Sequence, residues 1–174
     1  GFYVSNQQSG IHVTAANSYD VKDGYRSLEI DGKKYTYNNK IKTVLVALLD
    51  TEEPIQDEGQ YGGHASAASI HLVLMDNDSK RLRVLGIPAE TVTTIRSFSA
   101  DGRETSEETA PIGKAYANGD GGEESGMNLL YAVQSLLGNV PVNQFVVANR
   151  NGISWLNEYL DGITVEVPDN DLAM

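Results

Sequence analysis

Cysteine is absent from this sequence of 174 residues. The chain therefore has no disulfide, no thiolate nucleophile and no zinc site built on cysteine. It also lacks an apolar run of about 18 residues, the length that a membrane-spanning helix requires. The first residue is Gly1 and no leader peptide is recognisable, so we expect the native protein to contain sequence upstream of Gly1.

Positive charge is scarce as well. The sequence has 13 lysines and arginines against 24 aspartates and glutamates, which gives a net charge of −11 at pH 7. Such an excess of negative charge repels nucleic acids and anionic lipids at physiological salt. A general nucleic-acid binder is therefore excluded, and an anionic ligand would need a local basic pocket or a bound cation.

The length and the hydrophobic content of 40% fit one globular domain of the α/β or α+β type. Residues 1–26 are largely polar and show no sustained hydrophobic period, so they are predicted to form an irregular N-terminal arm. The ordered domain is predicted to cover residues 27–174.

The first half of the chain predicts strands and hairpins. The Asp31-Gly32 pair lies between two alternating runs, which is the strongest short-range hairpin signal. Residues 43–49 form a near-continuous apolar run rich in β-branched side chains, and this pattern is typical of a strand covered on both faces. That run ends at Asp50. Strands at residues 70–75 and 81–87 are predicted to form a second hairpin. Residues 92–109 are predicted to form an edge hairpin or a loop.

The second half of the chain changes to a helical period. Residues 123–137 carry leucine and valine at helical spacing, and Gly138 is placed to end the helix. A strand at residues 144–148, a helix at 151–160 and a strand at 163–167 are predicted to follow. Together they predict a right-handed crossover onto a mixed central β-sheet flanked by helices. In the last helix, Ile153, Leu156 and Leu160 are predicted to point inward.

Short motifs in a fixed order give the chain a family resemblance. The strand that ends at Asp50 stands where the LytR-CpsA-Psr family has an apolar strand ending in Leu-Gly-x-Asp. Residues 66–70 stand at the family's Arg-Ser-Asp-Thr-Ile motif, residues 87–91 at Ile-Pro-Arg-Asp-Thr, and residues 115–120 at Ala-Tyr-Ala-x-Gly-Gly. The resemblance covers residues 32–168. It implies an α/β domain that joins glycopolymers carried on polyprenyl diphosphate to peptidoglycan.

The resemblance also implies roles for individual residues. In the family, acids position a divalent cation and arginines bind the diphosphate, so that charge is neutralised during phosphoryl transfer. Asp50 and Glu90 are accordingly the candidate catalytic and Mg²⁺-binding residues. The candidate substrate-binding residues are Tyr116 and two arginines outside the family motifs, Arg83 and Arg96, which are chosen because they are near the motif strands and would replace a missing family arginine. As alternatives, Asp50 would cap a turn, and Glu90 and the arginines would be solvated surface charges.

Several charges of the family pattern are missing. Ala89 replaces the arginine of the second motif, and Ser66 and Ala68 replace the arginine and aspartate of the first. Two absent arginine contacts would remove roughly 3–6 kcal/mol of ligand or transition-state binding, at about 1.5–3 kcal/mol each. Two functions therefore stay open. One is the phosphotransferase, and the other is a non-catalytic domain that binds an envelope glycan, a lipid carrier or a protein.

The resemblance places the protein in the bacterial cell envelope, outside the cytoplasmic membrane. It implies a membrane anchor N-terminal to Gly1. Family members also continue into a further helix and an arginine-bearing strand, which would lie beyond Met174. The expected partner is a polyprenyl-diphosphate-linked glycan or cell-wall polymer, and no nucleic acid is expected.

Overall fold

The computed structural model describes residues 4–6, 11–14, 27–36, 38, 40–55, 59–162 and 164. Within them the helices are α1 (Lys114–Ala117), α2 (Glu123–Leu136) and α3 (Arg150–Tyr159). The strands are β1 (Val4–Asn6), β2 (Ile11–Thr14), β3 (Ser27–Ile30), β4 (Lys33–Thr36), β5 (Ile41–Leu49), β6 (Ala67–Asp76), β7 (Arg81–Ile87), β8 (Val92–Phe98), β9 (Glu104–Pro111) and β10 (Gln144–Ala148).

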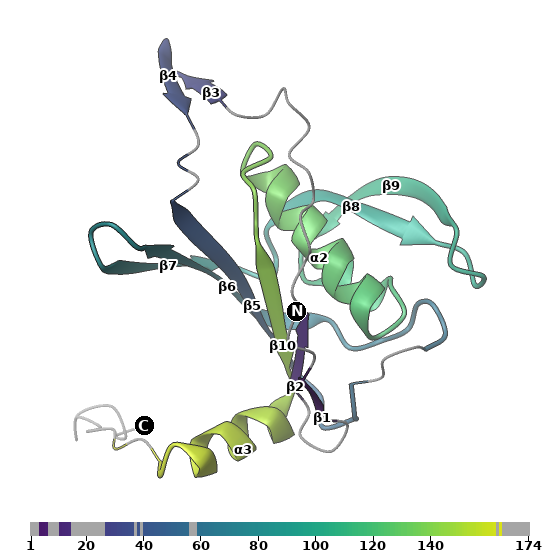
Figure 1. The fold of residues 1–174 in the computed structure, drawn as a ribbon. Coiled ribbons are helices and arrows are strands. Elements are labelled where there is room, and N and C mark those ends of the chain that lie inside the picture. Colours follow the sequence, from purple (N-terminus) through teal and green to yellow (C-terminus); the bar gives the residue numbers. More distant parts are fainter. Residues whose placement is uncertain are drawn as a thin grey trace, which may run out of the picture.

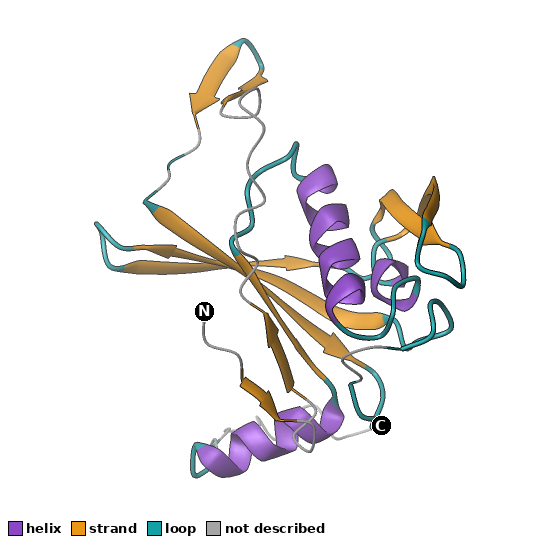
Figure 2. Ribbon diagram, turned by 45° about the vertical axis from the view of Figure 1, so that its right-hand side comes forward, coloured by secondary structure: helices purple, strands orange, loops and turns teal. Residues whose placement is uncertain are grey.

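A six-stranded sheet in the order β1-β2-β10-β5-β6-β7 forms the centre of the molecule (Figure 1). β10 pairs with β5 in parallel, and the other neighbours in this sheet are antiparallel. Helices α1 and α2 and the β8-β9 hairpin lie on one side of the sheet, whereas α3 lies at one end (Figure 2). The predicted α/β fold with a mixed central sheet and flanking helices is therefore confirmed.

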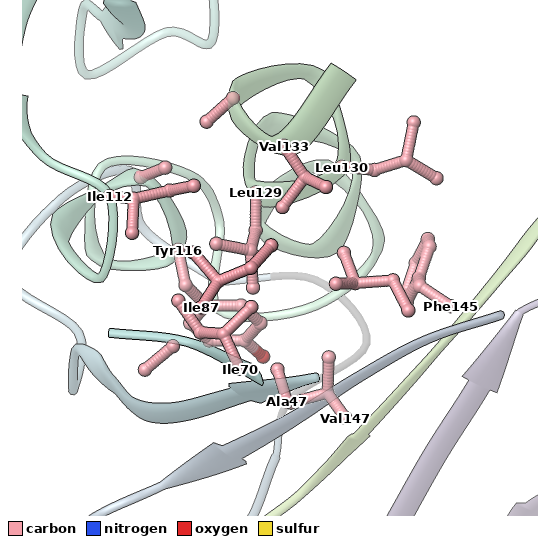
Figure 3. Packing of buried hydrophobic residues seen from close by; sticks show 14 of the residues in the cluster. Ala47, Ile70, Ile87, Ile112, Tyr116, Leu129, Leu130, Val133, Phe145 and Val147 are labelled. Atoms are coloured by element: carbon pink, nitrogen blue, oxygen red, sulfur yellow. The ribbon is translucent and has the colours of Figure 1, made fainter. Parts of the chain in front are cut away.

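The core lies between the sheet and α2. Leu45, Ala47 and Leu49 alternate along β5 toward α2, whose Leu129 and Val133 are fully buried (Figure 3). The intervening side chains of β5 on the opposite face are only partly buried. The expectation that this strand is covered on both faces thus holds for one face only.

The parallel pairing of β10 with β5 is fixed by a cluster of hydrogen bonds at its start. The backbone N–H of Thr43 donates to Oδ1 of Asn143 over 2.8 Å, and the Thr43 hydroxyl donates to the carbonyl of Pro141 over 2.9 Å. In return, the Asn143 N–H donates to Oγ1 of Thr43 over 3.0 Å. Because Thr43 is almost fully buried, these bonds set the register in a water-poor environment.

Both predicted hairpins in the first half of the chain are confirmed, by β3-β4 and β6-β7. Asp31 and Gly32 have φ values of 51° and 71°, the left-handed conformation that a two-residue hairpin turn needs. The predicted helix over residues 123–137 is confirmed by α2, and Gly138 follows it with a φ of 70°.

Two predictions for the ends of the chain fail. Residues 1–26 are not irregular throughout, since β1 and β2 lie within them and β2 pairs with β10. Ile153, Leu156 and Leu160 do not point inward, because all three side chains are exposed. The division of the chain at residue 27 stays a prediction. The last strand, predicted at residues 163–167, lies outside the described residues except for residue 164, which is not in a strand.

Across the ranges that the structure describes, no helix is long and apolar enough to cross a membrane.

Candidate functional site

Three of the four motif positions, those at Asp50, Ala67 and Ala89, lie together at one end of the sheet. Leu49, just before Asp50, pairs with Ala67. The Ala67 N–H donates to the carbonyl of Gly113 over 3.0 Å, and the Gly113 N–H donates to the carbonyl of Ala89 over 2.9 Å. A Cβ on Gly113 would lie only 2.5 Å from the Ala67 carbonyl oxygen, so only glycine allows this approach. Gly113 therefore links Ala67 to Ala89 through the backbone, and the pairing of Ala67 with Leu49 connects both to the Asp50 position.

Asp50 has a cationic partner that the sequence did not predict. Arg150, the first residue of α3, donates from Nε to Oδ1 of Asp50 over 2.9 Å, and its Nη2 donates to the same oxygen. This bonding raises the pKa of Arg150, since it favours the charged guanidinium. The Nη1 atom of Arg150 also lies 4.0 Å from the Glu52 carboxylate. Both Asp50 and Arg150 are exposed, so solvent screens the pair and it contributes little to stability.

The first turn of α3 is tied to the loop that follows β5. Asn149 caps the helix by accepting from the Gly152 N–H over 2.9 Å, and its own amide donates to the Glu53 carbonyl over 2.7 Å. The Arg150 N–H donates to the carbonyl of Thr51 over 3.1 Å. The local sequence gives one usable signal, an asparagine N-cap followed by a helix, but it cannot show which strand end the helix meets.

A cavity of about 230 Å³ opens beside Asp50. Leu49 and Thr51, the two chain neighbours of Asp50, both line it. Its wall is part apolar and part polar, with the His64 ring hydrogen-bonded to the Gln60 carbonyl over 2.6 Å. The full lining is Leu49, Thr51, Glu53, Pro54, Ile55, Gly63, His64, Ala65, Tyr116 and Gly121.

Tyr116 forms part of this wall. Its side chain is almost fully buried, and its hydroxyl donates to the Gly121 carbonyl over 2.6 Å. Burial, with a smaller contribution from Asp120, raises the pKa of Tyr116, so the phenol stays neutral. The ring can therefore pack against an apolar ligand, while its hydroxyl is already engaged.

Glu90 is exposed in the loop between β7 and β8 and adjoins Ala89, which Gly113 links to Ala67. Asp50 and Glu90 thus belong to neighbouring loops. Across the described ranges, however, no three histidine, aspartate or glutamate side chains gather closely enough to hold a metal ion by themselves.

Arg83 lies toward the other end of the sheet. It pairs with Leu74, which in turn pairs with Thr43 at the start of β5. The seven steps along the chain from Thr43 to Asp50 correspond to about 23 Å of strand. The structure therefore does not bring Arg83 to Asp50. The geometry does not support the predicted role of Arg83 in substrate binding.

Arg96 is enclosed between β8 and α2. Its guanidinium lies over the ring of Tyr131, 4.7 Å from the centroid, and 5.6 Å from that of Phe98. It also lies 3.5 Å from the Glu104 carboxylate, and only 14% of its side chain is exposed. Arg96 is not among the residues that line the cavity beside Asp50. These contacts indicate a packing role at this site.

The Tyr131 hydroxyl next to Arg96 gives a pH-dependent prediction. It donates to Oε1 of Glu107, and this bond, together with burial, raises the pKa of Tyr131 to about 12. In the unfolded chain a tyrosine ionises near pH 10. The contribution of Tyr131 to stability is therefore complete below about pH 10 and is lost as the pH rises toward 12.

We expect Glu107→Gln to lower the pKa of Tyr131, because the carboxylate that favours the neutral phenol is gone. The measurement is an ultraviolet titration in which the Tyr131→Phe curve is subtracted to isolate this residue. Glu108→Gln is the control, since Glu108 bonds to Ser97 and not to Tyr131. Equal shifts in both glutamine variants would contradict the assignment.

Comparison of the chain with protein-family models identifies its family. The model of the LytR_cpsA_psr family matches residues 2–172. The chain belongs to the LytR_cpsA_psr family. Among curated proteins, none matches it significantly.

Solved structures show the same fold. Protein gbs0355 from Streptococcus agalactiae is 23% identical, with a TM-score of 0.57 over 74% of this chain and 39% of that chain. The LytR-CPS2A-psr family protein YwtF (TagT) with bound octaprenyl pyrophosphate lipid is 19% identical, with a TM-score of 0.53 over 86% and 50%. TagT bound to LI-WTA is 19% identical, with a TM-score of 0.54 over 86% and 48%. The chain thus spans half or less of each of these solved chains.

Proposed function

We propose that this LytR_cpsA_psr domain binds a polyprenyl-diphosphate-linked glycopolymer in the bacterial cell envelope, outside the cytoplasmic membrane. The observation that carries the proposal is the cavity beside Asp50, which offers an apolar wall for a prenyl chain next to a polar strand end. The TagT structures with octaprenyl pyrophosphate and with LI-WTA support the same class of ligand. A membrane anchor N-terminal to these residues would keep the domain near lipid-linked substrates.

The charges around Asp50 decide how a diphosphate would bind. Asp50, Glu52 and Glu53 outnumber Arg150 in this loop, so a diphosphate alone would be repelled. Mg²⁺ typically uses one or two protein carboxylates and completes its shell with phosphate oxygens and water. Asp50 and Glu90 on neighbouring loops would supply the two carboxylates, and a diphosphate would supply further oxygen ligands. Without the diphosphate, the two carboxylates are too few to form the site. The cation would neutralise phosphate charge in the complex.

Binding without transfer is the function that the charges support best. The Asp50 carboxylate is already hydrogen-bonded to Arg150, and the motif positions Ser66, Ala68 and Ala89 carry no charge. Phosphotransfer is the second candidate, favoured by the retained carboxylates of Asp50, beside Leu49 that pairs with Ala67, and of Glu90, beside Ala89 that Gly113 links to Ala67.

The test is a calorimetric titration of the 174-residue chain with a soluble prenyl diphosphate, with and without Mg²⁺. We expect binding that depends on Mg²⁺ and weakens about 10- to 100-fold in Asp50→Asn, the loss of one charge-assisted contact. Asp101→Asn is the matched control, because Asp101 forms a comparable exposed pair with Arg103.

The same samples are assayed for phosphate release. No release is expected if the domain only binds. Release that Asp50→Asn abolishes would establish phosphoryl transfer to water, in which the P–O–P bridge breaks and prenyl monophosphate leaves. An absence of Mg²⁺-dependent binding would refute the proposed function.

A further inference from the structure

His64 can bring a positive charge to the cavity beside Asp50. Of the ten described residues that line this cavity, Glu53 is the one with an acidic side chain and His64 is the one with a basic side chain. The motif positions Ser66 and Ala89 carry no charge. A diphosphate in the cavity would therefore meet a carboxylate in the wall, and among these lining residues the histidine ring alone can offset that charge.

The orientation of the His64 ring is set by its own loop. Its Nε2 lies 2.6 Å from the carbonyl oxygen of Gln60. Because a carbonyl can only accept a hydrogen bond, Nε2 carries a hydrogen in the neutral ring as well as in the charged ring. Nδ1 is therefore the atom that gains a proton when the ring becomes charged. With that proton it changes from a hydrogen-bond acceptor to a donor.

Nδ1 of His64 is free to meet a ligand. Within the described part of the chain it has no hydrogen-bond partner. The buried side-chain polar atom that lacks a partner there is Nη2 of Arg96, so Nδ1 of the half-buried His64 is open to solvent. Gly121, another lining residue, lies against the ring, and a Cβ there would come within 2.8 Å of Nδ1. A larger residue at position 121 would displace the ring from this place.

The charged groups around His64 are mostly acidic. The titratable groups that adjoin it are Glu53 after β5, Tyr116 of α1, Asp120 and Glu124 at the start of α2, and Tyr61 of its own loop. Burial, followed by the charges of Glu124 and Asp120, raises the pKa of Tyr61. Of these residue types, histidine is the one whose charge ordinarily changes between pH 5 and 8. A change in anion binding over that range would therefore report on the imidazole.

We propose that the protonated ring of His64 binds a phosphate oxygen of the diphosphate, with Nδ1 as the donor. The inference rests on the proposed function for the class of ligand. The charged ring attracts the anion, whereas the neutral ring presents a lone pair to it, so binding includes the uptake of a proton. Affinity for the diphosphate should therefore rise as the pH falls from 8 toward 6. Mg²⁺ and the imidazolium would neutralise the phosphate charge together.

Proton NMR of the histidine rings tests the contact, with inorganic pyrophosphate and Mg²⁺ as the probe and Mg²⁺ alone as the reference. We expect pyrophosphate to raise the pH midpoint of the His64 signals by about one unit, which corresponds to about tenfold tighter binding to the charged ring. Loss of signals in His64→Gln assigns them. His71 is the matched control, because its Nδ1 is bonded to Ser69 and it does not line the cavity. An unchanged His64 midpoint, or an equal shift for His71, overturns the proposal.

Calorimetry with the soluble prenyl diphosphate and Mg²⁺ separates this inference from the proposed function. Titrations in two buffers of different ionisation enthalpy count the protons taken up, which should be fewer for His64→Gln than for the unmodified chain or His71→Gln. Glutamine keeps a donor for the Gln60 carbonyl but cannot take up a proton. As the pH falls from 8 to 6, the affinity of the unmodified chain relative to His64→Gln should rise by up to about tenfold. This ratio cancels the protonation of the diphosphate itself.

The outcomes of the two experiments distinguish the two proposals. If the prenyl diphosphate binds and His64→Gln matches the unmodified chain in proton uptake and pH dependence, the proposed function stands and the role of His64 falls. If the prenyl diphosphate does not bind but pyrophosphate still shifts the His64 midpoint, the anion contact stands and the proposed function falls. Circular dichroism confirms that each variant is folded.

Discussion

Asn128→Leu is expected to lower the free energy of unfolding by about 3 kcal/mol or more. The Asn128 side chain is fully buried in α2, and its amide donates to the carbonyls of Ala115 over 2.7 Å and of Arg96 over 2.9 Å. Its Oδ1 accepts from the Arg96 N–H over 3.3 Å. Leucine has a similar size but leaves these buried backbone groups without their partner, and each such group costs about 1–3 kcal/mol.

Urea unfolding followed by circular dichroism measures this loss. Gln134→Leu is the matched control, because it makes the same kind of change on a partly exposed position of α2. If Asn128→Leu were no less stable than the control, the side chain would not hold α2, α1 and β8 together. The same network also accounts for the placement of Arg96, whose carbonyl and N–H both bond to Asn128.

Gly126→Val is expected to lower the melting midpoint by roughly 6–12 °C, corresponding to about 3 kcal/mol for a chain of this size. A Cβ at Gly126 would lie 2.2 Å from Cε2 of Phe145, far inside contact distance. Phe145 is buried on β10, so its ring cannot move into solvent. The helix must therefore shift away from the sheet, which loosens the core along α2.

Thermal unfolding with two comparisons checks this result. Gly86→Val should be nearly neutral, because a Cβ there meets only the His71 ring at 3.8 Å. Combining Gly126→Ala with Phe145→Leu should recover part of the stability that Gly126→Ala loses, since the two residues compete for one space. Strict additivity of these two changes would show that the contact does not limit the packing.

The strands and α2 could be predicted because their signals are local. The alternation of β5, the Asp31-Gly32 turn and the leucine spacing of α2 each lie within a few consecutive residues. The packing of α3 could not be predicted in the same way. Its helical pattern is clear, but an apolar period shows only that one side avoids water and not which surface receives it.

The candidate site was predictable only in part. The family motifs identify Asp50 and the loops around Ala67 and Ala89, and the structure shows that Gly113 joins these loops. The pairing of Asp50 with Arg150 spans 100 residues and follows from where β10 ends beside β5. No pattern of charge or hydrophobic period in the sequence indicates that two residues so far apart in the chain form a pair.

The hydrogen bonds between Thr43 and Asn143 also bear on how the protein folds during synthesis. The two residues are 100 positions apart, so β5 and its antiparallel partner β6 leave the ribosome long before β10 does. Until then one edge of β5 is open to incorrect pairing or to association with other nascent chains. The centre of the sheet can therefore close only after residue 148 has been synthesised, because this edge of β5 pairs with β10.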